Sequence, residues 1–137
     1  MLAIEDTTTL GYKHGAKDEL GDLGGPENTT NKGIHAHSVL LLDAKEKTTI
    51  GLIEQTRWIR EPSKRGLRNK RLERSYEEKE SFKWEYSSRR VAQRLGEEMS
   101  KVISVCDRES DIYEYLAYKT EEQQRFVVRA TQNRQLF

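Results

Sequence analysis

Helix-type and strand-type hydrophobic patterns alternate in the second half of the chain, and this alternation restricts the fold more than any other feature. A largely apolar stripe at three- and four-residue spacing predicts a helix over residues 77–99. Its members are Trp84, Ser88, Val91, Leu95 and Met99. A strand over 101–106, a helix with Ser110 as its N-cap and a strand over 125–130 are predicted to follow. Elements in this order predict parallel strands that are connected by helices.

The first half of the chain contains three strand-like segments and one long polar segment. Strands are predicted over 2–5, 35–43 and 48–59, and the short spacer 44–47 predicts an antiparallel hairpin between the last two. Residues 7–31 are polar and rich in glycine, which predicts a long loop. We therefore expect a single α/β domain. Its sheet is mixed, with an antiparallel hairpin and parallel strands, and helices lie on its faces.

Composition limits the size and the environment of the protein. A chain of 137 residues has room for one domain with a modest core. The formal net charge of +1 gives no general evidence for a nucleic-acid partner, so such evidence must be local. The single cysteine, Cys106, excludes an internal disulfide and is typical of a reducing cytosol. Because neither a signal peptide nor a membrane-spanning apolar run is visible, we expect a soluble, cytoplasmic protein.

Two aspartates at predicted strand ends are the candidate chemical groups. Asp6 follows the first strand and Asp107 follows the strand over 101–106. If these strands are parallel neighbours, both carboxylates lie at the same edge of the sheet, where open α/β sheets hold their ligands. Paired carboxylates offer hard oxygen ligands that select Mg²⁺ or Mn²⁺. Alternation along the strand places Glu5 on the opposite face from Asp6, so Glu5 is a poor ligand candidate. The alternative is that both aspartates only begin turns.

Five collinear segments resemble the catalytic core of bacterial insertion-sequence DDE transposases of the IS-four family, which includes the Tn-five enzyme. Residues 3–8 (Ala-Ile-Glu-Asp-Thr-Thr) resemble the first catalytic motif of that family, and residues 105–111 (Val-Cys-Asp-Arg-Glu-Ser-Asp) resemble the second. Residues 37–42, 78–84 and 125–129 are similar to other parts of the same core. These segments occur in the same order as in the family and are spread from residue 3 to residue 129, which makes the resemblance much more specific than any single motif.

The resemblance implies an RNase-H-like fold and metal-dependent cut-and-paste transposition of a mobile DNA element. Asp6 and Asp107 match the first two acids of the metal-binding triad, so both are expected to be catalytic ligands of Mg²⁺ (or Mn²⁺). The implied partners are double-stranded DNA at the transposon ends and a transposase homodimer or an intact transposase. Glu109 and Asp111 follow the second acid closely. They are expected either to support the metal ligands or to be solvated residues at a helix start.

The third acid of the family has no match in this chain. In the family it is a glutamate in a Tyr-x-x-Arg-x-x-x-Glu-x-x-x-x-x-x-Lys pattern, and no segment between Ala117 and Phe137 fits it. The resemblance therefore implies an incomplete core, truncated at both ends, that binds metal weakly and is inactive alone. A degenerate element and a split gene are both compatible with such a core.

A basic segment within 57–76 is the second functional signal. Its cations are Arg57, Arg60, Lys64, Arg65, Arg68, Lys70, Arg71 and Arg74. Clustered cations of this kind predict sequence-independent contact with DNA phosphates, although a solvated charged loop has the same composition. Two alternative functions stay open. One is a non-catalytic DNA-binding or interaction module that acts through residues 57–74, and the other is a phosphohydrolase with Asp6 as its nucleophile.

Three other features are interpreted as structural. His35 and His37 have a zinc-compatible spacing, but Val39 and Leu41 continue the same strand face, which favours a role inside the sheet. Cys106 is expected to be a small buried hydrophobe that points away from the side chain of Asp107. Trp84 is expected in the core.

Overall fold

The structure is a computed structural model that describes residues 1–13, 15, 19–23, 32–60 and 74–133. The strands are β1 (Leu2–Tyr12), β2 (Gly21–Asp22), β3 (Lys32–Asp43), β4 (Thr48–Trp58), β5 (Ile103–Cys106) and β6 (Arg125–Val128). The α-helices are α2 (Lys83–Leu95) and α3 (Tyr113–Glu121), and short 3-10 helices span Glu80–Phe82, Gly96–Lys101 and Arg108–Ser110. Neither described α-helix has the length and the apolar character needed to cross a bilayer.

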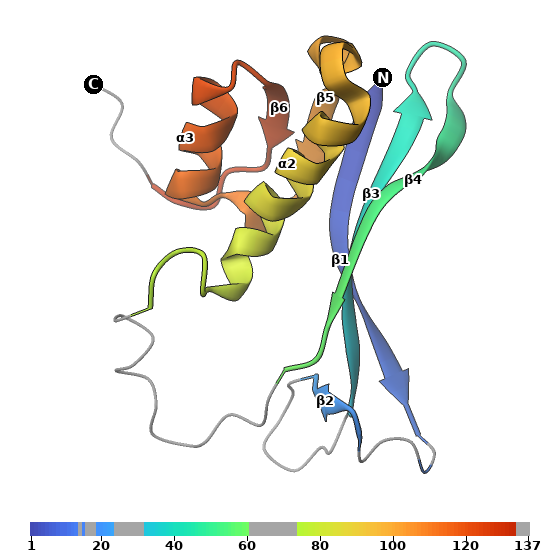
Figure 1. Ribbon diagram of the computed structural model, residues 1–137, viewed down its shortest axis with the longest axis vertical. Coiled ribbons are helices and arrows are strands. Elements are labelled where there is room, and N and C mark those ends of the chain that lie inside the picture. The colour runs from blue at the N-terminus through green and yellow to red at the C-terminus, as the bar shows by residue number, and fades with distance from the viewer. Residues whose placement is uncertain (14, 16–18, 24–31, 61–73, 134–137) are drawn as a thin grey trace.

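The strands form one mixed sheet (Figure 1). Its order is β4-β3-β1-β5-β6, and the short β2 pairs with the start of β3. The pairs β4/β3 and β3/β1 are antiparallel, whereas β1/β5 and β5/β6 are parallel. The strand pairs confirm both the predicted hairpin and the predicted parallel pairing. Each parallel connection contains a helix, as the crossover between parallel strands usually does.

The expected helices lie against the sheet, and both described α-helices pack on the same face of it. Lys119 of α3 shows this directly, because its ammonium donates to Ser88 of α2 and to Ser104 of β5. Side chains of alternating strand residues point toward the two helices. One apolar core there consists of Ala3, Val39, Leu41, Val91, Met99 and Val102.

A second, aromatic core fills the space between the helices and the centre of the sheet. Trp84 of α2, Tyr115 of α3 and Cys106 of β5 are its buried members, and Ile112, Leu116 and Val128 pack around them. The expected core positions of Trp84 and Cys106 are confirmed. The tyrosine hydroxyl lies 3.4 Å from the sulfur, so it has a polar partner in an otherwise apolar environment.

The boundaries of the helices differ from the sequence prediction for local reasons. The predicted helix over 77–99 is shorter, because Gly96 takes a positive φ of 52° that ends α2. Ser110 is not an N-cap, because it is buried within a 3-10 helix and its hydroxyl donates to the backbone carbonyl of Asp107 at 2.7 Å. The α-helix begins only at Tyr113.

The opposite face of the sheet, which we call the open face, carries a row of apolar side chains with one from each of five strands. Strand register places these residues side by side. In sheet order they are Leu52, Leu40, Ile4, Val105 and Val127. The outer two are 55% and 58% exposed and the inner three are half-buried. Neither described helix covers this row.

Candidate functional site

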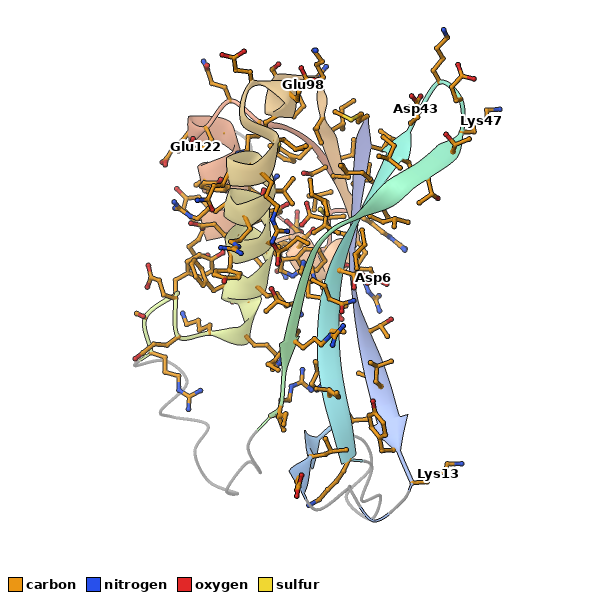
Figure 2. The ribbon with its side chains drawn as sticks, turned by 45° about the vertical axis from the view of Figure 1, so that its right-hand side comes forward. Asp6, Lys13, Asp43, Lys47, Glu98 and Glu122 are labelled. Atoms are coloured by element: carbon orange, nitrogen blue, oxygen red, sulfur yellow. The ribbon has the colours of Figure 1, made fainter. Side chains whose placement is uncertain are left out.

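Asp6 and Asp107 each follow one member of a register pair on the neighbouring parallel strands β1 and β5. Glu5 of β1 is in register with Cys106, the last residue of β5. Asp6 is the next residue of β1, and Asp107 follows directly after the end of β5. Adjacent strands are about 4.8 Å apart, so the two aspartates start from neighbouring backbone positions. Glu5 and Cys106 are buried toward the helices while both aspartates are exposed, so the carboxylates share the open face. Figure 2 shows Asp6 on the side of the sheet away from α2 and α3.

The prediction that Asp6 ends the first strand is wrong. β1 continues to Tyr12, and Asp6 pairs with Ser38 in the middle of the β1/β3 ladder. Residues 7–12 are therefore strand and not part of the predicted loop 7–31, of which residues 14, 16–18 and 24–31 lie outside the described part of the chain. The run Thr7-Thr8-Thr9 explains the extension, because β-branched residues favour strands.

Local hydrogen bonds hold both carboxylates at their strands. The backbone N–H of Thr7 donates to Asp6 Oδ1 at 2.7 Å. The backbone N–H of Glu109 donates to Asp107 Oδ1 at 2.8 Å, which caps the following 3-10 helix. Each carboxylate keeps further lone pairs for another ligand. Asp107 therefore does begin a turn, as the alternative interpretation predicted, whereas Asp6 lies inside strand β1.

The donor chemistry of this pair fits a hard divalent cation. Both side chains offer carboxylate oxygens on an exposed face, as Mg²⁺ and Mn²⁺ prefer. Among the residues that the structure describes, no group of three or more His, Cys, Asp or Glu side chains could hold a metal ion. Water and phosphate oxygens would have to supply the remaining ligands of a cation held by Asp6 and Asp107.

Glu109 and Asp111 differ in their surroundings. Glu109 is exposed and lies 3.6 Å from the ammonium of Lys83. Asp111 is buried, and its Oδ2 accepts backbone N–H bonds from Thr131 at 2.6 Å and Gln132 at 2.8 Å. Asp111 therefore fixes the segment after β6. Since it lies before α3 and not in its first turn, its predicted place at a helix start is wrong.

Most of the basic segment lies outside the described residues. This applies to Lys64, Arg65, Arg68, Lys70 and Arg71. Arg57 is exposed at the end of β4, and its Nε donates to Gln55 Oε1 at 2.7 Å. Arg60 forms a two-point ion pair with Glu80, with distances of 2.7 and 2.5 Å. Arg74 is exposed. The described part of the segment thus presents Arg57 and Arg74 to solvent.

The two histidines lie buried on the helix-covered face, as their strand alternation predicts. The ring of His37 packs edge-on against Trp84, with 4.5 Å between centroids, and His35 stacks on Trp58 at 5.3 Å. His37 Nε2 lies 3.8 Å from Glu5 Oε2, and His37 Nδ1 lies 3.0 Å from Thr7 Oγ1. The predicted position of Glu5 opposite Asp6 is confirmed.

A buried lysine is the polar feature that sequence reasoning missed. Lys119 has no exposed surface, and its ammonium donates to the oxygens of Ser88, Ser104 and Gln124. Burial lowers the pKa of Lys119, and the nearby Glu5 partly opposes this. Lysine is normally exposed, and its position next to polar neighbours in α3 gave no signal of burial.

The buried thiol of Cys106 is chemically quiet. Burial, together with the charge of Glu5, raises the pKa of Cys106 to about 12. A thiol with so high a pKa stays protonated at neutral pH and is a poor nucleophile. This supports the structural interpretation of Cys106.

Comparison with known protein families adds no identification, because no family model matches the chain. What the structure shows is an α/β chain with a mixed sheet, in which the exposed Asp6 and Asp107 each follow one member of the register pair Glu5 and Cys106.

Proposed function

We propose that this chain is a fragment of the catalytic domain of a DDE transposase from a bacterial insertion sequence, with an RNase-H-like fold. The observation that carries the proposal is the juxtaposition of Asp6 and Asp107. They are the two residues that match the acids of the family motifs. Both are exposed, and each directly follows one member of the register pair Glu5 and Cys106 on parallel strands.

The sheet supports the same proposal. An antiparallel hairpin joined to parallel strands is the arrangement expected for an RNase-H-like core. Both motif acids lie on its open face, where a DNA strand could approach without displacing α2 or α3. The proposed partners are double-stranded DNA of the transposon ends and a transposase, either as a homodimer or as an intact enzyme. A bacterial cytoplasm is the proposed location.

The proposed chemistry assigns simple roles to the two carboxylates. Asp6 and Asp107 would hold Mg²⁺ (or Mn²⁺), which supplies Lewis-acid activation of the attacking oxygen and charge stabilisation at the phosphodiester. The two side chains themselves bind and orient, and neither transfers a proton. Because no residue matches the third family acid, we propose weak metal binding and no strand cleavage by this chain alone.

Metal titration tests the proposal. Free Mn²⁺, measured by its electron paramagnetic resonance signal, should fall in the presence of the protein. Asp6→Asn and Asp107→Asn should each abolish this binding, and Glu98→Gln, an exposed acid at the far end of the molecule in Figure 2, should not. Unchanged Mn²⁺ binding in both aspartate variants would contradict the proposal. Charge reversal of Arg65, Arg68 and Arg71 should weaken binding to duplex DNA and leave Mn²⁺ binding unchanged.

A further inference from the structure

A row of polar side chains crosses the open face next to the apolar row. Asp6 of β1 is in register with Ser38 of β3, and Ser38 is in register with Gln55 of β4. Residues directly opposite in antiparallel strands share a face and have Cβ atoms about 5 Å apart. The row therefore runs from Asp107 through Asp6 and Ser38 to the edge strand. Arg57 lies two residues beyond Gln55 on that strand, and so on the same face.

Hydrogen bonds along this row have a fixed direction. Arg57 Nε donates to Gln55 Oε1 at 2.7 Å, and Gln55 Nε2 donates to Ser38 Oγ at 2.9 Å. A guanidinium only donates, so it determines which end of the Gln55 amide faces Arg57. The amide nitrogen must then face Ser38, whose oxygen must accept. The hydroxyl proton of Ser38 is consequently directed to a partner other than Gln55.

The hydrogen-bonded line Ser38–Gln55–Arg57 can bind a different kind of group at each end. At one end, the Ser38 hydroxyl has a proton to donate, and the carboxylate of Asp6 is its cross-strand neighbour. At the other end, Arg57 uses Nε for Gln55 and keeps its terminal N–H groups, which suit a phosphate. Arg57 and Asp6 are two strands and two residues apart, which places their backbones about 12 Å from each other.

We propose that Ser38 and Gln55 are positioning residues that connect the metal-binding carboxylates to a phosphate-binding arginine. Ser38 orients the carboxylate of Asp6, and Gln55 holds both Ser38 and the guanidinium of Arg57. A DNA strand whose reacting phosphate lies at Asp6 and Asp107 then crosses β1, β3 and β4, and Arg57 binds a phosphate near the reacting one. This inference rests on the proposed function and adds the path of the substrate.

Metal affinity tests the Ser38 end of the line. Ser38→Ala should weaken Mn²⁺ binding about tenfold, as is common when the partner of a metal ligand is removed. Gln55→Leu should also weaken it, by a smaller factor, because Gln55 acts on Asp6 only through Ser38. Ser38→Thr keeps the hydroxyl and should restore wild-type affinity. Thr49→Val is the matched control, because Thr49 is an exposed residue at the other end of β4, in register with Leu42. Circular dichroism checks the fold, and Gln55→Leu decides the matter if Ser38→Ala does not fold.

DNA binding tests the Arg57 end separately. With a short duplex oligonucleotide, Arg57→Leu should reduce the slope of log affinity against log salt by about one, because one phosphate contact is lost. Gln55→Leu should weaken binding severalfold with the slope unchanged, because the charge remains but is no longer oriented. A purely structural Gln55 would leave both the affinity for DNA and that for Mn²⁺ at their wild-type values.

The outcomes separate this inference from the proposed function. If Asp6→Asn abolishes Mn²⁺ binding while Ser38→Ala and Gln55→Leu bind Mn²⁺ as the wild type does, the positioning line is overturned and the metal pair stands. If Asp6→Asn and Asp107→Asn bind Mn²⁺ as the wild type does, the proposed function itself is overturned. Weakened binding in Ser38→Ala together with rescue in Ser38→Thr supports both.

Discussion

Asp6 and Asp107 are neighbours because each follows one member of the same register pair, Glu5 and Cys106, on parallel strands. This relationship depends on the β1/β5 pairing and not on any contact between the two side chains. It also separates the chemistry of the two faces, since Glu5 and Cys106 point into the core and the aspartates point to solvent.

Neutralising the two aspartates should affect metal-dependent stability and little else. Asparagine keeps an oxygen that can accept the backbone bonds from Thr7 and Glu109. Without metal, Asp6→Asn and Asp107→Asn should therefore change the free energy of unfolding by no more than about 0.5 kcal/mol. MgCl₂ should raise the melting temperature of the wild type but not of the variants. A loss of several kcal/mol without metal would show that these residues are structural.

The buried lysine should make stability depend on pH. Because burial lowers the pKa of Lys119 below its ordinary value of 10.5, the unfolded chain binds this proton more tightly. The contribution of Lys119 to stability therefore rises as pH increases from the lowered pKa toward 10.5. Lys119→Met removes the ammonium that donates to Ser88, Ser104 and Gln124 and should cost about 1–3 kcal/mol at pH 7.

Denaturant unfolding at several pH values checks the Lys119 prediction. The stability difference between the wild type and Lys119→Met should widen as pH rises toward 10.5, because only the wild type gains there. A difference that stays constant with pH would mean that the lysine titrates normally in the folded protein.

Trp84 should be a main contributor to stability. It is buried between His37 and Tyr115, so Trp84→Ala leaves a cavity in the aromatic core and should cost about 3–5 kcal/mol. Tyr113→Ala is the control, because Tyr113 is 74% exposed and its loss should cost no more than about 0.5 kcal/mol. Chemical denaturation of both variants compares them. Similar costs would show that Trp84 is not the core residue described here.

The apolar row on the open face should limit solubility. Contiguous exposed apolar surface promotes association. Leu52→Lys combined with Val127→Lys adds charge at both ends of the row and should reduce concentration-dependent light scattering. Thr49→Lys adds the same kind of charge to β4 outside the row and should have less effect. Equal scattering from the wild type and the double variant would exclude the row as the cause.

The sequence predicted the sheet better than the limits of its elements. Strand-favouring composition and the short spacer before Thr48 correctly indicated the β3/β4 hairpin, and the strand-helix-strand order indicated the parallel pairs. The extension of β1 beyond Asp6 was missed because Thr8 and Gly11 are read as loop residues without their partners. Pairing with β3 supplies the hydrogen bonds that hold them extended.

The candidate site was only partly visible in the sequence. The two motif aspartates were found because strand ends and family resemblance both pointed to them. The Ser38–Gln55–Arg57 line was not, because it depends on cross-strand register, and a bulge between Val39 and Leu40 shifts that register. A one-residue shift moves a side chain to the other face, so the alignment of Ser38 with Gln55 could not be predicted from periodicity alone.

Iron-directed cleavage of the polypeptide tests the central claim most directly. Fe²⁺ bound in place of Mg²⁺ produces hydroxyl radicals with ascorbate and peroxide, and these cut the backbone close to the metal. We predict cuts near residues 6 and 107 that are suppressed by excess Mg²⁺ and lost in Asp6→Asn. Cuts confined to other parts of the chain, or cuts at these two places that persist in Asp6→Asn, would contradict a metal site formed by Asp6 and Asp107.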